Sequence, residues 1–226
     1  MHPATSSAQN RLMSRRRDLL LIGAEIAALL LSATCAGCDE PGTLLCAPCR
    51  QALIPTPQDT VTPRGLVVRA ALPFEGVASR CIRRLKGEGE TLLAGPLGAA
   101  LAAVLTPEIA PTTWVIPVPT SRRAFRRRGY RVPDLLIRRA DADPQRVLSL
   151  VTSTVDQRGL GAQAREQNMR DAMRARRPGE GADAVIVDDV VTTGATIDEA
   201  ARALEAGGFR VVAAVALAAT PRRAGF

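Results

Sequence analysis

The chain has 226 residues, 46% of them hydrophobic, which is enough for one substantial domain with a small accessory module. Its formal net charge of +8 favours an anionic partner, such as a phosphate ligand, nucleic acid or a membrane surface. The one histidine, His2, lies in the N-terminal tail, which excludes histidine-based triads and histidine-ligated metal sites. With one Trp, one Tyr and four Phe, an RNA-binding surface built on base stacking is also disfavoured.

The N-terminal part is expected to hold a disordered tail over residues 1–14 and a helix plus a cysteine module over 15–53. The stretch 15–35 has a basic start and an apolar middle, like an export signal. However, Glu25 interrupts the apolar run, and the uninterrupted part is too short to span a bilayer. The apolar side chains also share one helical face. We therefore expect a packing helix in a cytoplasmic protein without a membrane span.

Four cysteines form a C-x2-C-x7-C-x2-C pattern: Cys35, Cys38, Cys46 and Cys49. Two such knuckles can close a tetrahedral site around zinc, and in a cytoplasmic protein this structural zinc is the favoured interpretation. Two disulfides in an exported chain, or a redox C-x-x-C pair, are the alternatives. Four closed ligands leave no open coordination position, so the zinc would be structural and not catalytic. The fifth cysteine, Cys81, fits a packed core thiol.

Residues 54–65 contain three prolines without periodicity and are expected to be a linker. Residues 66–226 show apolar runs that alternate with helical patterns, which predicts an α/β fold with a parallel sheet covered on both faces. The predicted strands are 66–74, 114–119, 146–151, 184–189 and 210–218. The predicted helices are 77–90, 93–105, 164–176 and 196–208.

Two adjacent acids, Asp188 and Asp189, end the apolar strand that starts at Ala184. In open α/β sheets this carboxyl edge is where ligands bind, and carboxylates there can accept the two hydroxyls of a ribose. The turn that follows offers consecutive amides, two hydroxyls and the start of a helix, which favour a phosphate group: Thr192, Thr193, Gly194, Ala195 and Thr196. Together these groups describe a site for a sugar 5-phosphate.

An ordinary strand–turn–helix is the alternative, since Thr196 and Glu199 have the spacing of a capping box. That interpretation explains one threonine and leaves both acids and Gly194 without a reason.

The segment "VIVDDVVTTGAT" resembles the phosphoribosyl pyrophosphate signature of type I phosphoribosyltransferases. The wider pattern resembles the ComF family of competence-associated, phosphoribosyltransferase-like proteins. That pattern comprises the double cysteine knuckle, "LKGEG", "VIPVPTSRRAFRRRGY" and the series from Gln157 to Asn168. The resemblance implies a type I phosphoribosyltransferase-like sheet flanked by helices over residues 66–226.

The resemblance also implies the roles of individual residues. Asp188 and Asp189 would bind the ribose hydroxyls and the turn 192–196 the 5-phosphate. Pro119, Thr120 and Ser121 would approach the pyrophosphate, and Arg128 would contact the ligand. Arg165 and Asn168 match an R-x-x-N element that could close over the substrate.

Other arginines of the segment 122–128 are better explained as a solvated basic loop or a nucleic-acid contact. The chain departs from the family where it reads Gly129-Tyr130-Arg131-Val132, since the family usually continues with Asn and Gln there.

Lys86 is the only lysine among 30 cationic residues, and it falls where the family motif also carries lysine. Since an ammonium differs from a guanidinium in shape and hydration, we expect it to contact phosphate or the acceptor, with chance as the competing explanation.

The resulting hypothesis is an enzyme that displaces pyrophosphate from C1 of phosphoribosyl pyrophosphate with magnesium, in nucleotide salvage or DNA uptake. The aromatic residues near candidate loops, Phe74, Phe125 and Tyr130, do not identify the acceptor. A regulator that binds the same ligand without turnover is one alternative. A protein that acts on single-stranded DNA or on DNA-uptake partners is the other, and a homodimer is the candidate assembly.

Overall fold

The computed structural model describes residues 34–151 and 172–221. The chain divides into two compact units, Met1–Ala52 and Leu53–Phe226, and each is described by itself. The expected tail 1–14 and the helix expected before the cysteine module lie outside the described residues.

In the described part of the first unit, tight turns surround one short helix, α2 (Ala47–Gln51). Thr34 and Pro41 form an isolated antiparallel bridge. Asp39 and Gly42 adopt left-handed backbone angles, with φ of 64° and 89°. Such angles reverse the chain within a few residues, and this is what brings cysteines distant in sequence close together.

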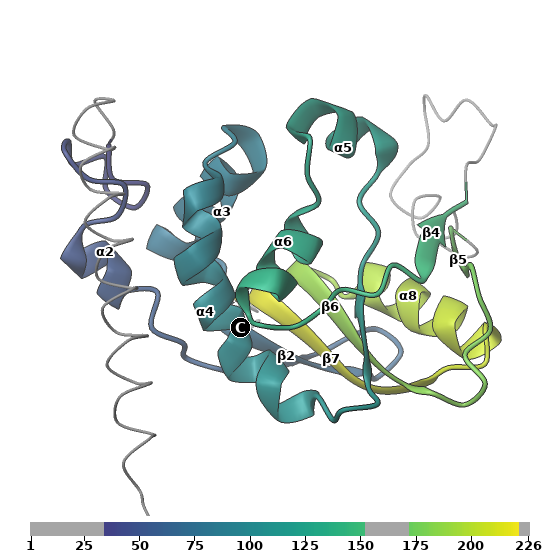
Figure 1. Ribbon diagram of the computed structural model, residues 1–226. Coiled ribbons are helices and arrows are strands. Elements are labelled where there is room, and N and C mark those ends of the chain that lie inside the picture. The colour runs from purple at the N-terminus through teal and green to yellow at the C-terminus, as the bar shows by residue number, and fades with distance from the viewer. Residues whose placement is uncertain (1–33, 152–171, 222–226) are drawn as a thin grey trace, which may run out of the picture. The chain divides into compact units, whose positions relative to one another are not determined.

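The second unit is a mixed α/β domain (Figure 1). Its strands are β1 (Gln58–Val61), β2 (Val67–Pro73), β3 (Trp114–Pro117), β4 (Leu148–Leu150), β5 (Met173–Ala175), β6 (Asp183–Val191) and β7 (Arg210–Ala219). Its helices are α3 (Gly76–Gly87), η1 (Thr91–Leu93), α4 (Ala94–Leu105), η2 (Thr106–Glu108), α5 (Arg122–Arg128), α6 (Val132–Arg139) and α8 (Ala195–Ala206).

The main sheet has the strand order β1-β2-β7-β6-β3. Strands β2, β7, β6 and β3 run parallel, and β1 pairs antiparallel with β2 at one edge. A separate antiparallel pair is formed by β4 and β5. Because β3, β6 and β7 are parallel neighbours, the loops that follow them leave the sheet at the same edge.

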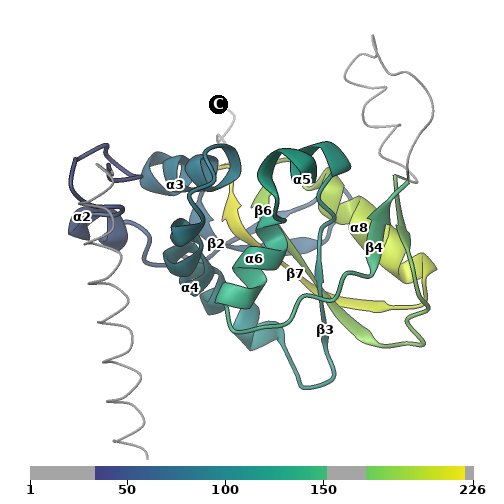
Figure 2. The same cartoon turned by 45° about the horizontal axis from the view of Figure 1, so that its top comes forward.

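Helices cover both faces of this sheet (Figure 2). Ala184 and Ile186 of β6 belong to a core cluster that includes Ile197 and Leu204 of α8. Their neighbours Val185 and Val187 are equally buried and lie on the opposite face, which α6 covers, because side chains alternate along a strand. Burial on both sides explains the continuous apolar run. The predicted parallel sheet with helices on both faces is confirmed.

The expected linker over 54–65 is replaced by β1, which pairs with β2 from Gln58↔Ala70 to Val61↔Val67. The sequence did not predict this strand, because it has no apolar run. Its residues alternate between half-buried and exposed, as is typical of an edge strand with one covered face. The prolines of this region flank the strand and do not interrupt it.

Two further differences from the expected elements lie in the second half of the chain. Most of the helix expected over 164–176 lies outside the described residues, but its end is strand β5. That end is held in a strand by tertiary hydrogen bonds to β4 and α8, which override its local helical pattern. The basic segment expected to be a loop contains helix α5.

The stretch Thr91–Glu108 has the length and hydropathy of a membrane span. Within it, α4 packs on β2 and β7, and its apolar side chains are buried: Leu97, Leu101, Val104 and Leu105. We therefore interpret this stretch as a core helix of the domain.

A close approach of α4 to the end of α6 generates a prediction about stability. A Cβ added at Gly98 of α4 would lie 2.3 Å from Cβ of Arg139 and 2.9 Å from its backbone carbon, at the end of α6. Gly98→Ala is therefore expected to destabilise the domain by about 1–3 kcal/mol through overpacking. Gly95→Ala is the matched control, since nothing lies within 4 Å of its added Cβ. Thermal unfolding followed by circular dichroism should show a lower Tm for Gly98→Ala alone, and equal Tm values would contradict the packing argument.

Candidate functional site

The two adjacent acids lie near the carboxyl end of the central strand β6. The strand continues past them to Val191, which pairs with Ala219, so it ends two residues later than expected. Asp189 is buried, with 8% of its surface exposed, and Asp188 is partly buried. The amide of Asp189 donates to Oδ1 of Asp188 at 2.8 Å, which fixes the two carboxyl groups relative to each other.

Lys86 lies at this pair of acids. Its Nζ is 2.8 Å from Oδ1 of Asp189, although 103 residues separate them in the chain. Lys86 is in the last turn of α3, which follows β2 at the carboxyl edge of the sheet. A buried carboxylate needs such a partner, since an unpaired charge there would be costly. The sequence indicated that this lysine was special, and the structure shows that it pairs with an acid of the predicted site.

The pKa of Asp188 is raised. Burial, together with the negative charge of Asp189, raises it to about 8, although the amide of Asp189 and the ammonium of Lys86 act in the opposite direction. Like charges held this close do not ionise independently. Without a ligand at neutral pH, the pair therefore carries a proton on Asp188 while Lys86 balances Asp189.

The turn after β6 exposes Thr192 and Thr193 and buries Gly194. Gly194 has a φ of 84° and is the N-cap of α8. A Cβ at this position would lie 2.8 Å from Cγ2 of Thr62, so glycine is required here by the fold as well as by any ligand.

The amides of this turn are largely unused by the protein. Ala195 N–H has only a long contact of 3.4 Å with Oγ1 of Thr193. Within the described ranges, the amides of Thr193, Gly194 and Thr196 have no protein acceptor. Free amides at the start of a twelve-residue helix can bind an anion.

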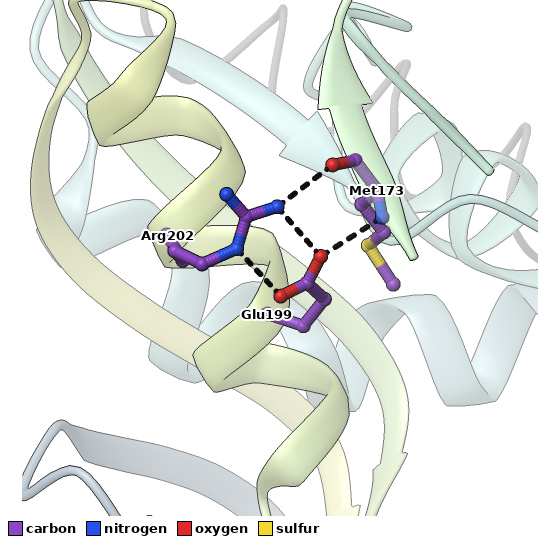
Figure 3. A network of polar contacts seen from close by, with 3 residues as sticks. All are labelled: Met173, Glu199 and Arg202. Atoms are coloured by element: carbon purple, nitrogen blue, oxygen red, sulfur yellow. Dashed lines mark hydrogen bonds and ion pairs between the residues drawn. The ribbon is translucent and has the colours of Figure 1, made fainter. Parts of the chain in front are cut away.

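The capping-box alternative is wrong. Glu199 does not reach back to the N-cap; it accepts the amide of Met173 at 2.9 Å and pairs with Arg202 at 2.7 Å (Figure 3). Arg202 in turn donates to the carbonyl of Met173 at 2.9 Å. This network of hydrogen bonds holds the three-residue strand β5 against α8. Glu199 therefore has a structural role that its capping-box spacing from Thr196 does not predict.

The loop after β3 lies beside the acids, because Pro117 pairs with Val187 in the parallel ladder and Val118 N–H donates to the carbonyl of Val187. Pro119 and Thr120 form this loop, and Ser121 is the N-cap of α5, with its Oγ accepting Ala124 N–H at 3.2 Å. The structure thus brings two of the predicted loops to one sheet edge.

Arg128 is in the last turn of α5. Its Nε is buried and has no hydrogen-bond partner among the described residues. A buried donor without an acceptor is costly in a finished fold. Arg128 is therefore suited to an acceptor that the protein itself does not supply.

The aromatic residues near the site are already engaged. Tyr130 O–H donates to the carbonyl of Leu85, next to Lys86. The guanidinium of Arg131 lies 4.2 Å from the centre of the Phe125 ring, and that of Arg83 lies 5.7 Å from Phe74. The rings thus stabilise the loops, and the geometry selects no particular base as acceptor.

In the first unit the four knuckle cysteines converge, with all sulfurs within 4.8 Å of one another: Cys35, Cys38, Cys46 and Cys49. The sulfur of Cys46 lies 3.6 Å from those of Cys35 and Cys38. A tetrahedral zinc site with Zn–S bonds of about 2.3 Å has sulfur–sulfur edges of roughly 3.8 Å. A disulfide would need about 2.05 Å, and none of the five cysteines forms one.

The sulfur of Cys35 is prepared to be a thiolate. Burial opposes its ionisation, but the amides of Cys46 and Gly37 donate to it at 3.3 and 3.4 Å. These hydrogen bonds lower the pKa of Cys35 to about 6. Cys81 belongs to α3 of the second unit and is fully buried, as expected for a core thiol.

Arg165 and Asn168 lie outside the described residues. Sequence reasoning missed the contact between Lys86 and Asp189 and the position of Tyr130 against α3. No local sequence pattern predicts either contact, because each one joins segments that are far apart in the chain.

Residues 124–226 match the family model described as a phosphoribosyl transferase domain. The chain is 36% identical over 103 residues to DNA utilization protein YhgH of Salmonella typhi, and 36% identical over 104 residues to that of Escherichia coli. Each match covers 43% of this chain and 45% of the relative. Competence protein F of Haemophilus influenzae is 33% identical over 98 residues, which is 40% of this chain and 43% of that protein.

The chain therefore spans less than half the length of the curated relatives it matches. Their names and the domain match confirm the predicted resemblance to competence-associated, phosphoribosyltransferase-like proteins.

Among solved structures, the chain is similar to orotate phosphoribosyltransferase from Aeropyrum pernix, with a TM-score of 0.34 and 18% identity over 75% of this chain and 78% of that chain.

The cysteine cluster predicts one bound zinc ion per chain. Replacing Cys38 and Cys46 by serine should abolish zinc binding, because two of four thiolate ligands are lost. Cys81→Ser is the matched control and should retain the metal. The zinc content of each variant is measured by mass spectrometry. Zinc retained in the double variant would refute the site.

The raised pKa of Asp188 predicts a pH-dependent stability. Between about pH 4 and pH 8 the folded state holds the proton that the unfolded chain releases, so stability falls as the pH rises. Asp188→Asn removes this loss and should raise the Tm at pH 8, by roughly 2–4 °C for each kcal/mol recovered. The gain should shrink towards pH 4. Asp183→Asn, on the same strand but ion-paired with Arg210 at the surface, should show no such gain.

Proposed function

We propose that this chain binds phosphoribosyl pyrophosphate and transfers its phosphoribosyl group to an acceptor with release of pyrophosphate. The observation that carries the proposal is the juxtaposition at one sheet edge of an acid pair and a turn with unused amides. Asp188 and Asp189 are followed within a few residues by the turn 192–196. The loop 119–121 enters the same edge from the neighbouring strand.

Recognition of the donor follows from the chemistry of these groups. Asp188 and Asp189 would accept hydrogen bonds from the ribose hydroxyls. The amides around Gly194 and the hydroxyls of Thr192, Thr193 and Thr196 would bind the 5-phosphate.

Backbone amides of Pro119–Ser121, apart from that of the proline, would approach the pyrophosphate. Arg128 is suited to the same group because its buried Nε has no protein acceptor.

Lys86 would act at the acids as well as at the phosphates. An ammonium has three N–H donors, and the contact with Asp189 uses one of them. The hydrogen bond from Tyr130 to Leu85 supports this end of α3 and so the position of Lys86. A phosphate or acceptor contact by the remaining donors stays a prediction.

In the proposed reaction, a nucleophile on the acceptor forms a bond to C1 while the bond from C1 to the pyrophosphate oxygen breaks and pyrophosphate leaves with the electron pair. The transition state would resemble an oxocarbenium ion. Magnesium bound with the donor would neutralise the leaving group. The residues of the site would hold the ribose and its phosphate in place, so positioning and charge stabilisation carry the rate. Such chemistry needs no histidine base.

The cysteine module would hold a structural zinc ion, since four thiol ligands leave no position for a substrate. Five cysteines without a disulfide suit a reducing compartment, which supports a cytoplasmic location. A homodimer remains our candidate assembly.

A role in DNA uptake or utilization is the second candidate function. The relatives are named for competence and DNA utilization. Helix α5 carries five arginines in seven residues, four of them exposed, which is suited to phosphate backbones. In this role the chain would bind single-stranded DNA or DNA-uptake proteins and use phosphoribosyl pyrophosphate as a regulatory ligand or not at all.

The proposal predicts a thermal shift with phosphoribosyl pyrophosphate and magnesium. At a ligand concentration of 100 times Kd, mass action stabilises the fold by about 2.7 kcal/mol. The double variant Asp188→Asn plus Asp189→Asn should lose this shift, whereas Asp183→Asn should retain it.

A parallel assay should detect pyrophosphate released in the presence of a panel of nucleobases. Shifts that are absent in the wild type, or equal in the wild type and the double variant, would overturn the site. A shift without pyrophosphate release would leave binding but remove catalysis with these acceptors.

A further inference from the structure

A second basic site lies at the other end of strand β3. A hollow of about 300 Å³ is lined by Trp114, Arg138, Gln145, Arg146 and Arg177, among others. Trp114 is the first residue of β3, whereas the proposed donor site follows its last residue, Pro117. Since a strand rises about 3.3 Å per residue, the two sites are separated by roughly 10 Å of sheet or more.

The arginines of this hollow come from three separate segments. Arg138 is near the end of α6, Arg146 precedes β4, and Arg177 follows β5. All three are exposed. The fold has therefore gathered guanidinium groups from distant parts of the sequence around one concave surface.

One of these arginines is held in place by a buried acid. Nε of Arg146 pairs with Oδ2 of Asp134 in the first turn of α6, and the side chain of Asp134 is only 4% exposed. The Nη donors of Arg146 have no protein acceptor in the described part of the chain. An arginine oriented through Nε by a buried carboxylate keeps its outer donors directed and available for a ligand.

The floor of the hollow is similarly fixed. Gln145 binds the backbone of Val115 twice: its Oε1 accepts Val115 N–H at 2.6 Å, and its own amide donates to the Val115 carbonyl at 2.8 Å. This clamp joins the segment before β4 to the edge strand β3. The hollow is therefore preformed, which lowers the entropy that a ligand must overcome.

Trp114 and Arg177 form the aromatic side of the hollow. The indole ring is held edge-to-face by Phe209, with ring centres 5.5 Å apart. The guanidinium of Arg177 lies 5.7 Å from the centre of the indole ring. A cation held over an aromatic face by its π system leaves its N–H donors for an anion.

The charge at the hollow is positive. The residues that line the hollow include three arginines and no acid, and the carboxylate of Asp134 is already paired with Arg146. Among the residues that the structure describes, neither Arg138 nor Arg177 has a carboxylate within 4 Å. Arginines gathered without compensating acids are typical of sites that bind phosphate groups, because the planar fork matches their oxygens.

We propose that this hollow is a second anion site, which binds the phosphate groups of a nucleotide through Arg138, Arg146 and Arg177 beside Trp114. The nucleotide is either free or part of a single strand, since both present the same phosphate chemistry. This site is independent of the donor site at the carboxyl edge and does not depend on catalysis there.

The test uses the full chain and its one tryptophan as a reporter within the site. Thymidine monophosphate and a fluorescein-labelled oligothymidylate of twelve nucleotides are titrated separately, followed by tryptophan emission and by anisotropy. The double variant Arg138→Gln plus Arg177→Gln should weaken binding about tenfold or more, because it removes two charged contacts to phosphate.

Arg64→Gln plus Arg83→Gln is the matched control, because it removes the same charge from exposed positions away from the hollow. It should change affinity less than twofold. The double variant of Asp188 and Asp189 should bind both probes like the wild type, which separates this inference from the proposed donor site.

Saturable binding of the monophosphate with a change in tryptophan emission identifies a free nucleotide as the ligand. Binding of the oligonucleotide alone, with the same dependence on Arg138 and Arg177, identifies a strand. Equal weakening in both arginine double variants means generic charge attraction and overturns the site. Unchanged tryptophan emission of the wild type with both probes also overturns it, whatever the variants show.

Discussion

The parallel register of β3, β6 and β7 is the constraint on which the rest of the structure depends. Because these strands are parallel, the residues that follow each of them lie at one edge of the sheet. There the loop after Pro117 lies beside the strand residues Val187 and Asp188. Apolar side chains cover both faces of β6, so its carboxyl end is a fixed platform and not a mobile loop. A shift of one residue would exchange the faces of every side chain and separate the acids from their partners.

Electrostatic balance at that edge follows from burial. Two adjacent carboxyl groups in a largely buried environment cannot both ionise unless a positive charge compensates them. The ammonium of Lys86 pairs with Asp189, and burial raises the pKa of Asp188. A polyhydroxyl ligand can donate hydrogen bonds to such a pair, and the neighbouring amides are free for an anion. The same arrangement lowers the stability of the empty domain at neutral pH, as is common where a site is kept ready for a ligand.

The two ends of β3 differ in the polar groups that they present. The carboxyl edge combines acids with backbone amides, and the amino edge gathers arginines around Trp114. Both ends are rigid for the same reason: polar groups that could move are held by buried partners, Asp134 for Arg146 and Asp189 for Lys86. A single sheet can therefore present both of the phosphate-binding surfaces that we propose without a change in the fold.

The sequence by itself determined the α/β class, the acids on a buried strand, the glycine turn and the four-cysteine pattern, because each rests on short-range periodicity or spacing. It did not reveal β1, whose alternation is shared with exposed loops, nor β5, whose local pattern is helical. Only the tertiary structure decided that Lys86 pairs with Asp189, that Glu199 binds Met173 and not the N-cap, and that three arginines converge beside Trp114. Such contacts join residues from separate segments of the chain, and their strength depends on a degree of burial that no local window of the sequence contains.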